Sequence, residues 1–323
     1  MSQRALVTGG AGFIGSHLTD HLLSEGWKVD IVDNLLSGHR EYINTSMQSD
    51  EVIIDDFSSN LVLDRVVKSQ YDCIFHLAAI PRVSFSVDHP MLTHETNVSK
   101  TLRLIDACRG NVKRFIFASS SSVYGGADIL PTSTNYQKNP KSPYALQKSI
   151  VEDYLKQYWA HYQLDSISLR FFNVFGPRQL GNSPYSTAVS SWLTSIMNGN
   201  SMRSDGDGTQ TRDLCYVENV VDACHKAAII RSETKASCYN VACGDRISNQ
   251  EILNYLKGRY PGAKYHSVPW RAGDVMHTQA DINDTKEALG YVPVVKFWEG
   301  LDRTISWYEK NWHAIKNYET KKC

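Results

Sequence analysis

A short apolar segment, a glycine-rich turn and a helical pattern follow one another at the start of the chain. Residues Arg4–Thr8 form the apolar segment, and Gly9, Gly12 and Gly15 come between it and a helical repeat of leucines. Glycines in a strand, turn and helix of this kind let the backbone approach a pyrophosphate, which then faces the amino end of the helix. The segment therefore predicts the first unit of a nucleotide-binding sheet.

A second apolar segment, Lys28–Val32, ends in Asp33. A carboxylate at this position hydrogen-bonds the adenosine ribose of NAD and repels the 2′-phosphate of NADP. Arg40 follows in the next loop, where it can either reach a phosphate or lie at the surface. The acidic residue favours NAD as the cofactor.

Apolar segments alternate with helical patterns through the first half of the chain. We expect strands at 52–54, 73–77, 114–118 and 166–171, and helices at 61–68, 91–108 and from Pro143 onward. Such alternation is typical of an α/β fold with a Rossmann-type doubly wound parallel sheet, whose ligands bind at the carboxyl ends of its strands.

The regular alternation breaks down in the second half, where prolines and glycines accumulate between 177 and 208. Helical patterns follow at 218–230, 249–259, 281–289 and 297–312. We therefore expect a NAD-binding domain over residues 1–174. A smaller α/β lobe is expected mainly over residues 175–323, with later chain crossings between the two.

Charge and cysteine content exclude several classes of protein. The 34 Lys and Arg residues balance 34 Asp and Glu residues without a long run of either sign, which argues against a nucleic-acid or membrane-surface partner. The 7 cysteines lack the paired spacing of a zinc or redox site, so we expect no metal and a reducing compartment. Neither a secretion signal nor a bilayer-spanning apolar stretch is recognisable, and we expect a cytoplasmic protein.

Two polar features fall near the predicted ligand-binding edge. Tyr144 and Lys148 are four residues apart, so both lie on one face of the expected helix. A tyrosine base needs its pKa lowered by about 3 units from about 10, and a nearby ammonium favours the phenolate. Taken alone, the pair also suits an ordinary amphipathic helix. The other feature is the run Ser119–Ser122 at a strand end, which is either simply polar or supplies a hydroxyl to a reacting group.

Together these motifs resemble the extended short-chain dehydrogenase/reductase family and, within it, the nucleotide-sugar 4-epimerases of the UDP-N-acetylglucosamine or UDP-glucose type. The similarity runs from about residue 4 to 308. It rests on the segments Thr8-Gly9-Gly10-x-Gly12-x-x-Gly15, His76-Leu77-Ala78-Ala79, Ser119-Ser120-Ser121-Ser122-Val123-Tyr124-Gly125, Tyr144-x-x-x-Lys148, Arg170-Phe171-Phe172-Asn173-Val174-Phe175-Gly176-Pro177 and Trp270-Arg271-Ala272-Gly273-Asp274-Val275.

The resemblance implies roles for individual residues. Tyr144 is implied as the catalytic base and Lys148 as the residue that lowers its pKa and holds the nicotinamide ribose. Ser120 is implied as the hydroxyl that bonds the sugar O4, with Ser121 and Ser122 open as alternatives. The implied NAD-binding residues, besides Tyr144 and Lys148, are Gly9, Gly12, Phe13, Ile14, Gly15, Asp33, Asn34, Ser37, Gly38, Asp56, Phe57, Leu77, Ala78, Ala79, Asn97 and Phe171. The implied substrate-binding residues, besides Ser120, Ser121, Ser122 and Tyr144, are Arg82, Ser84, Asn173, Arg212, Arg271, Asp274 and Thr278.

The serine run and Thr278 narrow the reaction that the resemblance implies. Dehydratases of the family carry Thr-Asp-Glu where this chain has Ser120, Ser121 and Ser122, and decarboxylases tend to carry a Glu where it has Ser122. Related epimerases restricted to plain hexoses carry a Tyr where this chain has Thr278, and those that accept 2-acetamido sugars carry a small residue. The resemblance therefore implies NAD-dependent interconversion of UDP-N-acetylglucosamine and UDP-N-acetylgalactosamine by a homodimer. UDP-glucose/UDP-galactose epimerisation, a reductase or dehydratase of the family, and a non-catalytic dinucleotide sensor remain as alternatives.

Overall fold

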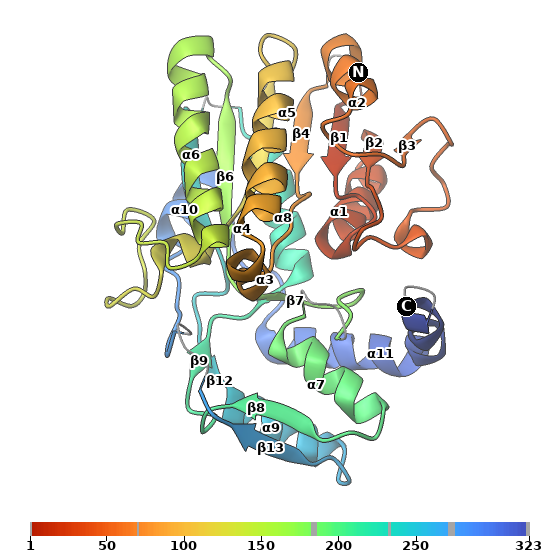
Figure 1. The fold of residues 1–323 in the computed structure, drawn as a ribbon, viewed down its shortest axis with the longest axis vertical. Coiled ribbons are helices and arrows are strands. Elements are labelled where there is room, and N and C mark those ends of the chain that lie inside the picture. The colour runs from red at the N-terminus through yellow and green to blue at the C-terminus, as the bar shows by residue number, and fades with distance from the viewer. Residues whose placement is uncertain (1, 70, 182–185, 232–233, 271–274, 321–323) are drawn as a thin grey trace.

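A parallel sheet of seven strands forms the centre of the computed structural model, which describes residues 2–69, 71–181, 186–231, 234–270 and 275–320 (Figure 1). The strand order is β11-β6-β5-β4-β1-β2-β3, and every neighbouring pair is parallel. The strands are β1 (Arg4–Thr8), β2 (Lys28–Val32), β3 (Val52–Ile53), β4 (Cys73–His76), β5 (Arg114–Ser120), β6 (Ser166–Phe171) and β11 (Ser237–Val241). The predicted Rossmann-type α/β fold is confirmed.

Helices cover both faces of this sheet, which explains why its strands read as nearly continuous apolar runs. On one face, α1 (Phe13–Ser24), α8 (Val217–Ile229) and α10 (Asn283–Leu289) bury Leu18 and Val220 against strand residues such as Val7. On the other face, α2 (Asn60–Ser69), α5 (Thr101–Ala107) and α6 (Pro143–Tyr162) bury Leu104 and Leu155 against Leu6. In Figure 1, α5 and α6 lie in front of the sheet and α8 behind it.

Most predicted boundaries agree with the structure to within one or two residues, but the helix predicted at 297–312 continues to Thr320. The strand predicted at 114–118 continues to Ser120, because the serines still pair with β6. The helix predicted at 91–108 consists of α4 (Pro90–His94), a π-helical segment (Glu95–Lys100) and α5. The helix α3 (Val83–Asp88) was not predicted because it is too short to show a helical period, and strand β11 was not predicted because polar Ser237 and Asn240 interrupt its apolar residues.

A second group of elements lies beyond the carboxyl ends of the central strands (Figure 1). Three two-stranded sheets pair β7 (Val174–Phe175) with β10 (Cys215–Tyr216), β9 (Thr211–Arg212) with β12 (Ile247–Ser248), and β8 (Met202–Asp205) with β13 (Tyr265–Val268). Helices α7 (Ala188–Met197), α9 (Asn249–Arg259) and α11 (Phe297–Thr320) pack around a core that includes Trp192, Leu253 and Tyr308. The division of the chain at residue 174 stays a prediction, although β11 does return to the main sheet.

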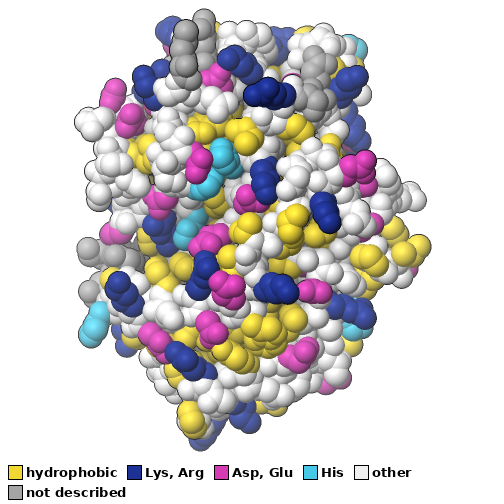
Figure 2. All heavy atoms as spheres, turned by 180° about the vertical axis from the view of Figure 1, so that it is seen from behind, with side chains coloured by type: hydrophobic (Ala, Val, Ile, Leu, Met, Phe, Trp, Pro, Cys, Tyr) yellow, Lys and Arg dark blue, Asp and Glu magenta, His cyan; other side chains and the backbone are white. Residues whose placement is uncertain are grey.

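The surface carries both signs of charge. Figure 2 shows basic and acidic side chains interspersed over the face opposite to that of Figure 1. Among the described residues, no helix combines the length and apolar character needed to cross a bilayer.

Candidate active site

The glycine turn after β1 leaves little room for a side chain at Gly12 and none at Gly15. A Cβ added to Gly15 would lie 2.0 Å from the carbonyl oxygen of Gly9, and one added to Gly12 would lie 3.1 Å from that oxygen. Gly9 itself has a φ of +73° and faces the Ala78 backbone, where an added Cβ would lie 3.0 Å from the amide nitrogen. Gly12 is the N-cap of α1, and Phe13, Ile14 and Gly15 form its first turn. The turn therefore offers an open backbone cradle at a helix N-terminus, which fits a pyrophosphate.

The carboxylate of Asp33 is held beside this cradle. It accepts hydrogen bonds from the backbone N–H groups of Ala11, at 3.0 Å, and Leu35, at 2.8 Å. Gly38 closes over it, because a Cβ there would lie 2.6 Å from the Asp33 Oδ1. Asn34, Ser37 and Gly38 occupy the loop that follows β2. This arrangement fits an adenosine ribose at the end of β2.

The loop after β4 runs along the opposite side of the cradle. It contains Leu77, Ala78 and Ala79, and the Ala78 N–H donates to the hydroxyl oxygen of Thr8 at 3.2 Å. That hydroxyl also lies 2.8 Å from His76 Nδ1. Burial, together with the positive charge of Lys148, lowers the pKa of His76 to about 3. His76 is therefore a neutral support for the loop at physiological pH.

Three predicted cofactor residues have their side chains engaged with the protein. Asn97 forms hydrogen bonds with both backbone groups of Ile80, at 2.8 and 3.0 Å, and with Gln147 at 2.8 Å. Asp56 forms an ion pair with Lys100 at 2.6 Å. Phe57 is buried, with its ring centroid 4.8 Å from that of His76. The side chains of these residues brace the loops around the cofactor site. Phe171, the last residue of β6, lies partly buried against the core.

Helix α6 presents Tyr144 and Lys148 to the carboxyl end of β5. Ser142 caps the helix by accepting a hydrogen bond from the Ala145 N–H at 3.2 Å, and Pro143 begins its first turn. The N–H of Tyr144 donates to the Ser86 hydroxyl of α3 at 3.0 Å. The ammonium of Lys148 lies 5.8 Å from the centroid of the Tyr144 ring. The predicted pair therefore does meet on one helical face.

Both groups of this pair have shifted pKa values. Burial raises the pKa of Tyr144 to about 12, although a hydrogen bond with Ser120 opposes the shift. Burial lowers the pKa of Lys148 to about 7, against the attraction of Glu152. Perturbed groups of this kind concentrate at functional sites. Within the protein alone the tyrosine is a phenol at neutral pH, so its use as a base requires additional positive charge nearby.

The side chains of the four consecutive serines have different partners. Ser119 is buried and donates to the carboxylate of Glu152 at 2.6 Å. Ser120 Oγ accepts from the N–H of Ser122 at 3.2 Å and from its hydroxyl at 2.9 Å. Ser121 begins the 3₁₀ helix η3 (Ser121–Tyr124), half-buried. Of the four, Ser120 is the one that acts to lower the pKa of Tyr144.

Three residues predicted to bind substrate form a second cluster, beyond the carboxyl ends of the central strands. The Asn173 side-chain amide donates to Thr278 Oγ1 at 3.4 Å and to the Asp213 carbonyl oxygen at 3.1 Å. Thr278 Oγ1 also accepts from the Asp213 N–H at 3.2 Å. The Arg212 guanidinium donates to the Met276 carbonyl oxygen at 3.1 Å. Three predicted residues thus meet around the backbone of Asp213.

The remaining predicted substrate residues fall elsewhere. Arg82 is the N-cap of α3 and Ser84 lies in its first turn, and both are exposed. Arg271 and Asp274 lie outside the described residues.

Several supporting residues were missed from the sequence. Ser86, Gln147, Glu152, Arg170 and Asp213 are all buried and hold the site residues in place. Glu152 was detectable, because it continues the four-residue spacing of Tyr144 and Lys148 along one helix face. The others have no local signal, because their partners lie far away in the sequence.

Comparison with known proteins agrees with this fold and site. Residues 5–242 match the NAD dependent epimerase/dehydratase family. The chain belongs to this family, and its cofactor is NAD.

Individual relatives extend the similarity to nearly the whole chain. The UDP-glucose 4-epimerase of Mycolicibacterium smegmatis is 35% identical over 94% of this chain and 98% of its own length. The solved structure of the UDP-N-acetylglucosamine 4-epimerase from Methanobrevibacter ruminantium M1, in complex with UDP-N-acetylmuramic acid, is 35% identical, with a TM-score of 0.89 over 96% of this chain and 99% of that one. The UDP-N-acetyl-alpha-D-glucosaminuronate decarboxylase of Bacillus cytotoxicus is 30% identical over 96% of this chain and 99% of its own length.

Proposed function

We propose that this enzyme interconverts UDP-N-acetylglucosamine and UDP-N-acetylgalactosamine by epimerisation at C4, through a 4-keto sugar. The observation that carries the proposal is the placement of Tyr144 and Lys148 on α6, where the Lys148 ammonium donates to the Ala118 carbonyl oxygen at the end of β5, beside Ser120, Ser121 and Ser122. Elimination and decarboxylation are disfavoured because Ser121 and Ser122 stand where the relatives that catalyse them carry acids.

The chain's own residues would handle the proton of the reaction. Tyr144 takes the proton from the sugar 4-hydroxyl, while Ser120 hydrogen-bonds the sugar O4. Lys148 supplies positive charge, which favours the phenolate form of Tyr144. NAD, when bound, would supply the hydride chemistry at C4 of the sugar. Burial raises the pKa of Tyr144, and the positive charge of an oxidised nicotinamide bound nearby would lower it again.

The cluster around Asp213 would anchor the nucleotide. The Arg212 guanidinium and the Asn173 amide are donors suited to diphosphate oxygens. We propose Arg271 and Asp274, which lie outside the described residues, as further ligands of the diphosphate and the ribose. A firm anchor at the diphosphate lets the 4-keto sugar turn over without leaving the enzyme.

Thr278 favours the acetylated substrate. Its side chain is small, and its hydroxyl is already bound to the Asp213 N–H, so it takes up little of the sugar pocket. UDP-glucose and UDP-galactose are the second candidate substrates, because the Mycolicibacterium smegmatis relative carries the name UDP-glucose 4-epimerase.

A homodimer would cover an apolar surface around α4 and α6. Met91 is 80% exposed and Leu92 is 53% exposed on α4, and Leu146 and Tyr154, eight residues apart on one stripe of α6, are 49% and 42% exposed. Large apolar side chains gathered in this way mark an interaction surface. Light scattering after gel filtration should give twice the chain mass for the wild type and a monomer for Leu146→Glu.

Product analysis tests the proposed reaction directly. Purified protein is incubated with UDP-N-acetylglucosamine in the absence of added cofactor, and the products are separated by chromatography. UDP-N-acetylgalactosamine should appear at once if NAD is retained. Conversion of UDP-galactose alone would keep the mechanism but overturn the substrate, and inactivity with both sugars even after NAD is added would refute the proposed epimerase.

A further inference from the structure

Glu152 is a fully buried carboxylate on the same helix face as Tyr144 and Lys148, with 0% of its side chain exposed. Its Oε1 accepts from the Ser119 hydroxyl at 2.6 Å and from Arg170 Nε at 2.9 Å. Its Oε2 accepts from Arg170 Nη2 at 2.7 Å. A buried charge is costly unless paired and hydrogen-bonded, and this one is both.

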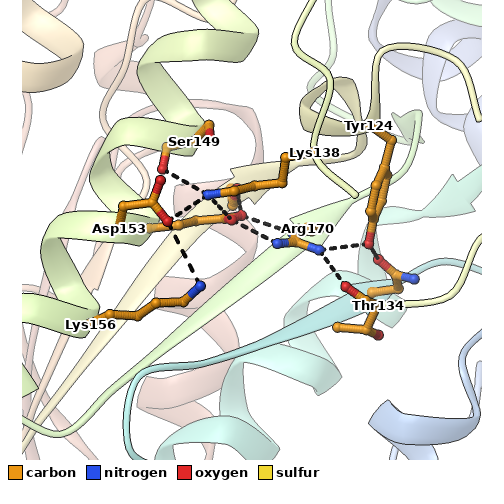
Figure 3. Close-up of polar contacts among 10 residues, drawn as sticks. Tyr124, Thr134, Lys138, Ser149, Asp153, Lys156 and Arg170 are labelled. Atoms are coloured by element: carbon orange, nitrogen blue, oxygen red, sulfur yellow. Dashed lines mark hydrogen bonds and ion pairs between the residues drawn. The ribbon is translucent and has the colours of Figure 1, made fainter. Parts of the chain in front are cut away.

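The far side of Arg170 continues the network toward η3. Its Nη1 donates to the Tyr124 hydroxyl and to the Thr134 carbonyl oxygen, both at 2.9 Å. The Tyr124 hydroxyl in turn donates to Asn240 Oδ1 at 2.6 Å. Figure 3 shows Arg170 between Tyr124 and Thr134 on one side and Lys138 on the other. One ion pair thus joins α6, β6, η3 and β11.

The network meets the reacting groups at the end of β5. Lys148 donates to the carbonyl oxygen of Ala118 at 2.7 Å, and Glu152 holds the hydroxyl of the next residue, Ser119. Ser120, which acts to lower the pKa of Tyr144, follows directly as the last residue of β5. Two successive contacts from α6 therefore fix the strand end from which Ser120 projects.

We propose that Glu152 is a positioning residue of the reaction, which holds the end of β5 that carries Ser120 through Ser119 and supplies a buried negative charge beside Lys148. This inference rests on the proposed function only for the identity of the reaction. The contacts themselves belong to the protein without substrate.

The charged and titratable groups that face Glu152 come from every element packed against it. They are Lys138 from the preceding loop, at 3.6 Å, Lys148 from α6, Tyr124 from η3, Arg170 from β6 and Cys238 from β11. His76 is the other titratable side chain beside Lys148. Removing the carboxylate charge leaves Arg170 uncompensated, which disfavours the Lys148 ammonium and favours the Tyr144 phenolate. The pKa values of both groups should therefore fall.

Glu152→Gln removes the negative charge of the carboxylate. Ser119→Ala removes the hydroxyl that joins Glu152 to the end of β5. The control is Asp153→Asn, which removes a neighbouring carboxylate that is 58% exposed and pairs with the same Lys138. The Lys148 side chain is titrated by NMR of protein carrying ¹³C at the lysine ε-carbon, with Lys148→Met used for assignment. This readout needs no substrate, so it stands even if the proposed reaction is wrong.

We expect Lys148 to titrate near pH 7 in the wild type and in Asp153→Asn, and at lower pH in Glu152→Gln. Both limbs of the pH profile of kcat should move to lower pH in Glu152→Gln. Ser119→Ala should lower kcat by up to about 100-fold, as a misplaced reacting group does, with KM and the pH limbs unchanged.

An unmoved Lys148 titration in folded Glu152→Gln, or an equal shift in Asp153→Asn, would overturn the electrostatic part of the proposal. Unchanged kcat in Ser119→Ala would overturn the positioning part. If Glu152→Gln does not fold, Glu152→Asp replaces it, since it retains the charge and shortens the reach. That variant should then lower kcat without moving the titration of Lys148, and a normal kcat would contradict the proposal.

Discussion

The ammonium of Lys148 donates a 2.7 Å hydrogen bond to the carbonyl oxygen of Ala118, and this contact ties helix α6 to the carboxyl end of β5. The same ammonium lies 4.6 Å from the centroid of the Phe117 ring. Helix and strand are therefore held in one register where Tyr144 and Ser120 meet. The arrangement requires the side chains near this point to be both buried and polar.

Replacing Tyr144 with Phe should lower kcat by about 10²–10⁴-fold, since the base is lost while the ring still fills its buried position. Product formation and the circular dichroism spectrum are the measurements. Tyr154→Phe is the matched control, because Tyr154 lies on the same helix with 42% of its surface exposed. Near-normal turnover by folded Tyr144→Phe would refute its role as the base.

Replacing Thr278 with Tyr should abolish turnover of UDP-N-acetylglucosamine and spare that of UDP-glucose, because the larger ring occupies the space of the acetamido group. The replacement also removes the hydroxyl that accepts from the Asp213 N–H at 3.2 Å. Thr278→Ser retains that acceptor, so it should keep both activities. Equal loss of both sugars in Thr278→Tyr would show that the residue supports the nucleotide site and does not select the sugar.

Gly15→Ala should weaken NAD binding and destabilise the fold by roughly 1–3 kcal/mol, because its Cβ would lie 2.0 Å from the Gly9 carbonyl oxygen. Calorimetric titration with NAD and the melting temperature measure the two effects. Gly258→Ala is the control. An added Cβ there meets nothing within 4 Å on helix α9, so the change should stabilise the fold by about 0.5–1 kcal/mol. Unaltered NAD affinity in Gly15→Ala would argue against the cradle.

The protein should lose stability as the pH falls below about 6.5. Burial lowers the pKa of His76 to about 3 and that of His17 to about 4. Between these values and about 6.5 the unfolded chain binds the protons, so stability falls with decreasing pH, by about 2 kcal/mol for each histidine at pH 5. Urea unfolding at pH 7.5 and pH 5 measures the loss.

His17→Gln and His76→Gln should each reduce this acid sensitivity, whereas His313→Gln, at an exposed position, should not. If the two buried-site variants lose as much stability on acidification as the wild type, other groups are responsible.

The local pattern of apolar residues predicted the elements that are buried along one face or along their whole length. Strands β1, β2 and β6 and helix α9 have the bounds expected from it. The strands bury nearly every residue and the helix buries one face, so neighbouring positions carry the signal. The polar end of β5 lacks such a pattern, and the predicted strand stopped too early there. The helix α3 also lacks it and was not predicted.

The sequence by itself determined the parallel α/β architecture, the glycine cradle and the shared helix face of Tyr144 and Lys148, because these depend on residue types at short spacings. Only the tertiary structure decided that β11 pairs with β6 and that Arg170 pairs with Glu152. It alone also gathered Asn173 and Thr278, 105 positions apart, around Asp213. These contacts join residues that are far apart in the chain, so no local sequence pattern predicts them. The free energy that favours the contacts comes from burial in the assembled fold.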